Sequence, residues 1–171
     1  MFMNKTKILT LDKERILFLT QLVILVGVAT LAPLFGHQAI TGPLVNATLF
    51  VSTILLGVQA GILVGLIPSL IALSTGLLPP VLAPMIPFIM VGNTILVIAF
   101  NYLKDNYWLG VVVAGTLKFF FLFSSSMTVV GLFSKREVAQ RIVLMMGWSQ
   151  LFTALVGGLL AYFFLKKINR L

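Results

Sequence analysis

The stretch YWLGVVVAGTLKFFFLFSSSMTVVGLF, residues 107–133, determines the class of fold that this chain can adopt. It carries a single charge, Lys118, close to its middle. A helix needs about 20 mostly apolar residues to cross the hydrocarbon core of a bilayer, and this segment is long enough. The whole chain is as strongly apolar as this segment suggests: 60% of its 171 residues are hydrophobic, 9% are charged and the mean hydropathy is +1.12. A soluble domain has too little interior for so much apolar surface, so the sequence predicts an all-α integral membrane protein.

Other apolar segments lie on both sides of this stretch, separated by turn residues. Residues 44–74 are too many for one span, and we expect Gly57 and Gly61 to mark a tight turn among them, because glycine adopts positive φ at little cost. A single kinked, strongly tilted helix is the alternative. Residues 35–43 and the proline-rich residues 77–84 are predicted loops. We therefore predict one membrane domain over residues 1–171, with six transmembrane helices at about 16–34, 44–56, 60–75, 85–103, 107–133 and 148–165.

The basic residues favour one orientation for these six helices. Cytoplasmic loops of membrane proteins carry an excess of lysine and arginine. Placing both termini inside (N-in/C-in) puts most of the basic residues on the inner side, leaves three outside and keeps Lys118 within the membrane. The inner residues are Lys5, Lys7, Lys13, Arg15, Lys104, Lys166, Lys167 and Arg170, and the outer residues are Lys135, Arg136 and Arg141. This orientation predicts a multi-pass protein of the cell membrane.

The predicted connections differ between the two sides of the membrane. The three outer connections are long and rich in polar residues or proline, and residues 137–146 in the third one can form a short interfacial helix. The inner connections, at residues 57–61 and 104–106, are minimal turns. We therefore expect a compact bundle with an outward-facing pocket.

The composition excludes several kinds of site. With no cysteine and one histidine, the chain offers neither thiolate nor multi-histidine metal sites. It lacks phosphate-loop, nucleophile-elbow and metalloprotease motifs, so we expect no enzymatic activity and no cofactor. The basic residues cluster at span ends, so nucleic acid is not an expected partner. All four acidic residues (Asp12, Glu14, Asp105 and Glu137) fall at termini or loops, so transport would be passive or driven by a partner rather than by a coupling ion.

Lys118 is the strongest candidate for a functional group, because a charge at mid-membrane depth is costly. Helical spacing puts it on one face with Ala114, Leu122 and Ser125, and we expect this small or polar face to point inward. Lys118 would then form the floor of a substrate cavity and bind an anionic or carbonyl group. In the alternative, it caps carbonyls of a broken helix or bonds to Asn93 only to satisfy its own hydrogen-bonding groups.

Polar residues near the outer half of the bundle complete the predicted substrate site. Asn46 and Asn93 are expected on the cavity walls, although amides in a bilayer equally well link helices. His37 and Gln38 would contribute to the roof, unless they belong to a solvated loop. The last helix begins with a tryptophan, whose default role is an aromatic-belt anchor, and a glutamine. The predicted substrate-binding residues are His37, Gln38, Asn46, Asn93, Lys118, Trp148 and Gln150.

Gly57, Gly61 and Gly65 form a row of small residues around the first inner turn. Such rows let membrane helices approach each other closely. The row could receive a helix of another membrane protein, and we take it as the candidate partner-docking surface. It could equally pack inside the bundle against the first or last helix.

One combination of features extends over nearly the whole chain. It consists of a short first helix, a polar loop leading into Leu44-Val45-Asn46, the turn from Gly57 to Gly61, the proline-rich loop 77–84, Pro87 followed by Gly92-Asn93, and Lys118 after Ala114-Gly115. This combination resembles the substrate-binding S components of energy-coupling factor (ECF) vitamin transporters. The alanine-xxx-alanine docking motif that the family often carries on its first helix is not matched, because Ala29 and Ala32 are three residues apart.

The resemblance implies a function and partners. Members of the family have six helices with both termini inside the cell, and they lie in the prokaryotic plasma membrane. They bind a vitamin or related micronutrient near the outer face and dock onto a transmembrane T protein with two ATPases. A structural or assembly subunit of a larger membrane complex, with Lys118 paired to a partner's carboxylate, is the main alternative. A self-contained facilitator is the third.

Overall fold

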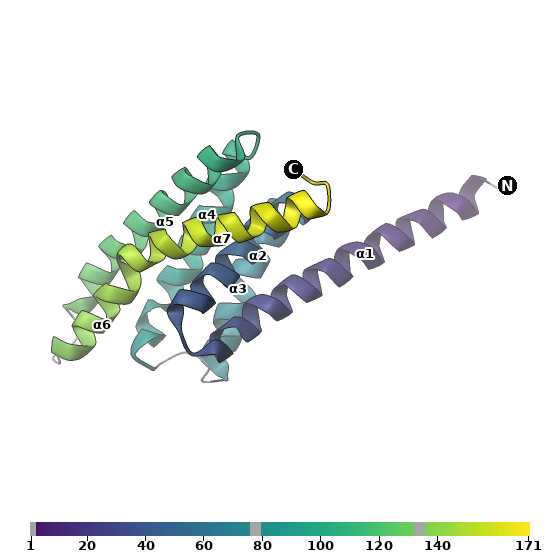
Figure 1. The fold of residues 1–171 in the computed structure, drawn as a ribbon. Helices are drawn as coiled ribbons and strands as arrows, with labels where there is room; N and C mark the ends of the chain where they lie inside the picture. The colour runs from purple at the N-terminus through teal and green to yellow at the C-terminus, as the bar shows by residue number, and fades with distance from the viewer. Residues whose placement is uncertain (1–2, 76–79, 132–135) are drawn as a thin grey trace.

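The structure is a computed structural model that describes residues 3–75, 80–131 and 136–171, and the regular elements in these ranges are all helical. Figure 1 shows most of the helices packed side by side in an elongated bundle. The helices are α1 (Met3–Leu31), α2 (Gln38–Leu56), α3 (Val58–Ser74), α4 (Ile86–Leu103), α5 (Tyr107–Val130), α6 (Arg136–Met146) and α7 (Trp148–Lys167). Two 3-10 turns, η1 (Ala32–Phe35) and η2 (Pro80–Met85), follow α1 and precede α4.

Several helices are long and apolar enough to cross a membrane, which confirms the prediction of an all-α, multi-span protein at this level. Within the described residues, five segments meet the length and hydropathy expected of a span: Asp12–Phe35, Gln38–Leu56, Ala83–Leu103, Tyr107–Val130 and Ile142–Lys167. Helix α3 is also apolar but has only 17 residues. At 1.5 Å per residue it extends for about 26 Å, slightly less than the ~30 Å hydrocarbon core of a bilayer.

Gly57 divides the second apolar stretch into two helices, as predicted. Its φ of +88° is a left-handed conformation that a residue with a Cβ rarely adopts. Helix α2 ends before it and α3 begins directly after it. The alternative of a single kinked helix over these residues is therefore wrong.

The prediction of a loop at residues 35–43 is wrong beyond His37, because α2 already begins at Gln38 and contains Gly42 and Pro43. Close packing on α7 accounts for this: a Cβ added to Gly42 would lie 2.6 Å from Thr153 Cγ2. Gly42, which indicates a turn in the sequence, therefore lies within α2 and allows its close contact with α7. The predicted start of the first helix at about residue 16 is also wrong, because α1 already begins at Met3. The remaining predicted helix bounds hold within a few residues where the structure describes them. The expected loop at 77–79 and the expected helix end at 132–133 lie outside the described residues.

The bundle has two distinct ends. Both chain termini lie at one end, and α6 lies at the other with the turn that joins α1 to α2 (Figure 1). The short connection at residues 104–106 belongs to the end with the termini, which we call the terminal end. The predicted short helix at residues 137–146 is confirmed as α6 and belongs to the opposite end, which we call the distal end.

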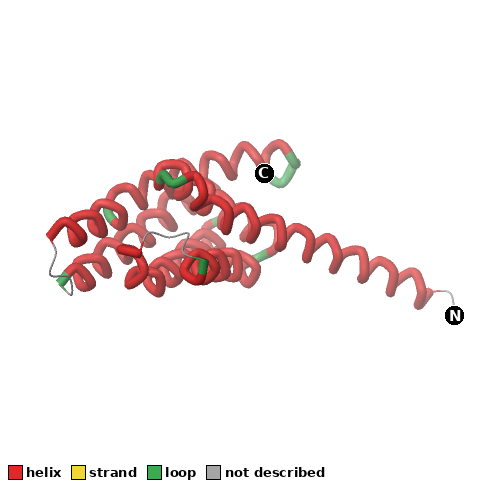
Figure 2. Tube along the Cα trace, turned by 90° about the horizontal axis from the view of Figure 1, so that it is seen from below, coloured by secondary structure: helices red, strands yellow, loops and turns green. Residues whose placement is uncertain are grey.

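Helix α1 is the least enclosed element of the structure. Its N-terminal part extends well beyond the other helices (Figure 2). Apolar side chains on different faces of this helix are open to the surroundings, with 63% of Ile16, 58% of Leu17 and 57% of Leu19 exposed. Exposing so much apolar surface to water is unfavourable, whereas the hydrocarbon of a bilayer accommodates it. This exposure agrees with a membrane environment.

Candidate small-molecule binding site

A cavity of about 220 Å³ lies in the distal half of the bundle. It is lined by residues near the distal ends of α1, α2, α3, α4 and α7, by the end of α6 and by the middle of α5. Its walls are largely apolar, with Val45, Val64, Pro68, Ile89 and Met146 among them. A few polar side chains converge on it, which is the usual composition of a small-molecule site.

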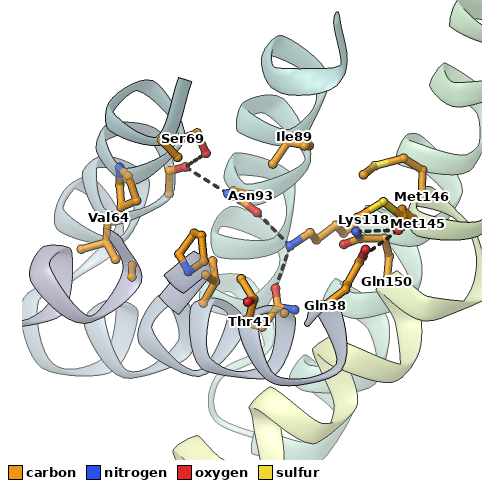
Figure 3. A pocket seen from close by; sticks show the side chains of 18 of the residues that line it. Gln38, Thr41, Val64, Ser69, Ile89, Asn93, Lys118, Met145, Met146 and Gln150 are labelled. Atoms are coloured by element: carbon orange, nitrogen blue, oxygen red, sulfur yellow. Dashed lines mark hydrogen bonds between the residues drawn. The ribbon is translucent and has the colours of Figure 1, made fainter. Parts of the chain in front are cut away.

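Lys118 is the charged group of this cavity. Its side chain is 3% exposed, and its Nζ donates hydrogen bonds to Asn46 Oδ1 at 2.7 Å and to Asn93 Oδ1 at 2.8 Å. Figure 3 shows both bonds, which join α5 to α2 and α4. The prediction that the Lys118 face points inward is confirmed, because Ala114 and Leu122 are fully buried.

Both asparagines are held so that their oxygens face Lys118. Asn93 Nδ2 donates to the carbonyl oxygen of Gly65 at 3.0 Å, and Asn46 Nδ2 donates to Thr153 Oγ1 at 3.4 Å. Since an amide nitrogen cannot accept these bonds, each Oδ1 is left to accept from the lysine. A Cβ at residue 65 would lie 2.9 Å from Asn93 Cβ, so the glycine permits the close approach of α3 and α4.

The ammonium of Lys118 has capacity for a further partner. An ammonium carries three N–H donors, and the two amides occupy two of them. The partners found among the described side chains are neutral, and the acidic residues Asp12, Glu14 and Asp105 are exposed. A buried cation is costly without a counter-charge. An anionic or carbonyl group in the cavity would supply the missing acceptor.

Two glutamines tie the end of α6 to the rim of the cavity. Gln38 Nε2 donates to the carbonyl oxygen of Met145 at 2.8 Å, and Gln150 Nε2 donates to the same oxygen at 2.9 Å (Figure 3). These bonds place the backbone of α6 between the first turns of α2 and α7. Met145 and Met146 thereby form one wall of the cavity.

The structure brings six of the seven predicted substrate-binding residues to the cavity. The six are His37, Gln38, Asn46, Asn93, Lys118 and Gln150. The exposed His37 immediately precedes α2. Trp148 is not among the lining residues: it is 75% exposed and stacks on Phe119, with ring centroids 5.0 Å apart. That position corresponds to the default role of an interfacial tryptophan.

The predicted docking row of glycines lies mostly inside the bundle. A Cβ at Gly61 would lie 2.7 Å from Thr53 Oγ1, and Gly65 faces Asn93. These two glycines are buried between α3 and its neighbours α2 and α4, so they are not open to a partner in this conformation. Gly57, at the turn, has no such close neighbour, and docking at that turn stays a prediction.

Several cavity residues were not predicted from the sequence. Met145 and Met146, at the end of α6, carry no signal beyond their place next to the predicted interfacial helix. The carbonyl oxygens of Gly65 and Met145 accept hydrogen bonds from cavity side chains, and such backbone acceptors cannot be identified from a sequence. Among the residues that the structure describes, no group of histidine and acidic side chains could hold a metal ion.

Comparisons with known proteins give no further assignment. The chain matches no protein-family model, no curated protein and no solved structure. The interpretation of the cavity therefore depends on its own geometry.

Proposed function

We propose that this chain is the membrane-embedded substrate-binding subunit of an ECF-type, ATP-driven importer for a vitamin or related micronutrient. The observation that carries this proposal is the buried Lys118, which is fixed by two asparagines and lies beside a mostly apolar cavity. The described residues leave one of its three N–H donors without a partner. Uncompensated charges inside membrane proteins usually mark substrate or ion pathways.

The position of the cavity supports binding from outside the cell. The excess of basic residues at the two termini favours a cytoplasmic terminal end. The cavity residues come from the opposite, distal half of the bundle. If the chain crosses the cell membrane six times with both termini inside, the cavity opens to the outside of the cell.

The source of energy is part of the proposal. The acidic residues Asp12, Glu14 and Asp105 are exposed, and Glu137 belongs to the first turn of α6 rather than to a spanning segment. A transporter driven by its own ion gradient generally needs a titratable group within its spans to carry that ion. Energy would instead come from partners, which in an ECF transporter are a transmembrane T protein and two ATPase subunits.

Native mass spectrometry of the protein, gently purified from its own host, tests this function. We expect a small molecule to co-purify with the wild-type chain and to be lost in Lys118→Met, which removes the charge but retains most of the side-chain volume. The matched control is Lys167→Met, because this lysine is exposed at the terminal end. T-protein and ATPase subunits in the same preparation would support the importer.

A different outcome would favour an assembly subunit. Stoichiometric partner proteins without a small molecule, in a complex that dissociates in Lys118→Met, would overturn the proposal. That result would mean that Lys118 pairs with a carboxylate of a partner instead of a ligand. Solute flux through the purified chain alone, without ATP, would instead indicate a facilitator.

A further inference from the structure

Gln38 presents a fixed acceptor that nothing in the described structure uses. Its Nε2 is bound to the Met145 carbonyl oxygen, and this bond determines the orientation of the side-chain amide, because a carbonyl only accepts. The other end of the amide, Oε1, is buried and has no hydrogen-bond partner among the described residues. Buried side-chain oxygens without a partner are rare in folded proteins, so each calls for an explanation.

Gln38 is one of the residues that line the cavity, so a ligand held there would lie next to its side chain. Figure 3 shows Gln38 and Gln150 on the α6 side of the cavity, while the Lys118 amino group reaches towards Asn93. The site thus contains two unused groups of opposite kind: a donor on Lys118 and an acceptor on Gln38. A ligand that satisfies both must carry an acceptor in one place and an N–H or O–H donor in another.

Charge and volume narrow the class of molecule. The lysine ammonium has neutral protein partners, and a carboxylate would compensate its charge. The cavity volume of about 220 Å³ corresponds to a molecule on the order of ten non-hydrogen atoms. Apolar walls such as Val64 and Ile89 suit a hydrocarbon or aromatic body between the two polar groups.

We infer that the site selects a small carboxylate that bears a hydroxyl or N–H donor, with Lys118 binding the carboxylate and Gln38 Oε1 accepting from the donor. This inference rests on the proposed binding function and adds the class of ligand. Gln38 is then a specificity-determining residue, because a ligand without the donor would leave a buried acceptor unpaired.

Binding of a matched series of benzoates tests this inference. Isothermal titration of the full chain in nanodiscs would compare benzoate, the three positional isomers of hydroxybenzoate and the corresponding hydroxybenzamides. We expect at least one hydroxybenzoate to bind about fivefold to tenfold more tightly than benzoate, because one additional hydrogen bond forms. It should also bind at least tenfold more tightly than its amide, which lacks the charge.

Two variants connect these preferences to single residues. Gln38→Met removes the unused acceptor, and we expect it to abolish the preference for hydroxybenzoate over benzoate. Gln59→Met is the matched control, because this glutamine is exposed in the first turn of α3 and does not line the cavity. The hydroxyl preference should survive in that control. Lys118→Met should abolish the preference for the carboxylate over the amide.

Three results would overturn the inference: equal binding of benzoate and all hydroxybenzoates, a hydroxyl preference that persists in Gln38→Met, or no binding of any member of the series. These results can be distinguished from a failure of the proposed function. If native mass spectrometry identifies a bound molecule that lacks a carboxylate or a donor, the binding function stands and the ligand class is wrong. If no small molecule co-purifies, the binding function itself fails.

Discussion

The two halves of this bundle are built from the same helices but packed in different ways. In the terminal half, aromatic rings fill the space between α2, α4 and α5: Phe50 and Phe100 meet edge to face with centroids 4.7 Å apart, and Tyr107 meets Phe100 at 5.6 Å. In the distal half, the same helices surround a cavity and aim polar groups into it.

Under the proposed function, the terminal half is arranged for stability and the distal half for binding. In the terminal half, the Tyr107 hydroxyl donates to the Gly158 carbonyl oxygen at 2.6 Å, so even its buried polar group is satisfied. In the distal half, the described residues leave hydrogen-bonding capacity on Lys118 and Gln38 unused beside the cavity. Unpaired polar groups at a binding site commonly lower the stability of the folded protein. Substitutions should therefore separate into those that unfold the protein and those that affect binding.

The largest effect on stability is expected from Phe100→Ala in the terminal half. This side chain is fully buried against Phe50 and Tyr107, and truncating a buried phenylalanine costs about 3–5 kcal/mol of unfolding free energy. Thermal unfolding in detergent micelles measures this loss. The folded fraction should still bind ligand with wild-type affinity, and a large loss of affinity without loss of stability would contradict the division into halves.

The converse result is expected for Lys118→Met in the distal half. Ligand affinity should fall roughly a hundredfold, because a charge-assisted bond from a buried group is lost. Stability should change little, since removing a buried charge offsets the loss of bonds to Asn46 and Asn93. Titration of the co-purifying molecule and thermal unfolding of the same preparation measure the two quantities. An unfolded variant would mean that Lys118 is chiefly a structural link.

Gly65→Ala should affect both properties, because Gly65 lies where α3 approaches the polar cluster. The new methyl group would lie 2.9 Å from Asn93 Cβ and would push α3 away from α4. We expect a loss of about 1–3 kcal/mol in stability, as for other overpacked sites, together with weaker binding as Asn93 shifts. Gly27→Ala is the control, because a Cβ there has no neighbour within 4 Å. Equal behaviour of the two variants would refute the role of this close approach.

Tyr107→Phe should give a smaller loss of stability than Phe100→Ala or Gly65→Ala. It removes the hydroxyl that bonds to Gly158 and leaves the ring packing in place. We expect a loss of about 1 kcal/mol in unfolding free energy and no change in ligand affinity. Chemical denaturation with a parallel binding titration checks both, and a change in affinity would show that the two halves are coupled.

Trp148→Ala serves as a negative control for the distal half. Its ring stacks on Phe119 outside the cavity and is largely exposed. Ligand affinity should stay within about twofold of the wild type, a difference that corresponds to about 0.4 kcal/mol. Titration with the co-purifying molecule measures this, and a tenfold loss would bring Trp148 back into the binding site as the sequence first suggested.

Features that depend on helical period or on the local conformation of a glycine were predictable from the sequence. The inward face of Lys118 follows from helical spacing, and the break between α2 and α3 follows from Gly57. The start of α2 was not predictable, because Gly42 and Pro43 have the local signature of a turn while their packing on α7 depends on distant residues. Local propensity is a weak guide wherever tertiary packing overrides it.

The polar contacts of the site were predictable only as a set of residue types. Lys118, Asn46 and Asn93 were expected at one cavity because polar groups avoid lipid, but the sequence does not specify which atoms meet. The bond from Gln38 to Met145 spans 107 residues and ends on a backbone oxygen. No pattern of side chains could have indicated it. The same is true of the carbonyl of Gly65, which orients Asn93.

The central claim is that the cavity beside Lys118 holds a small molecule, and an electron cryomicroscopy map of the protein purified from its own host tests it most directly. We expect density for a non-protein molecule in the distal cavity, with a polar atom at about 3 Å from Lys118 Nζ. A second polar atom should lie at hydrogen-bond distance from Gln38 Oε1. A cavity occupied by a partner's side chain, or closed by repacking of Met145 and Met146, would contradict the account.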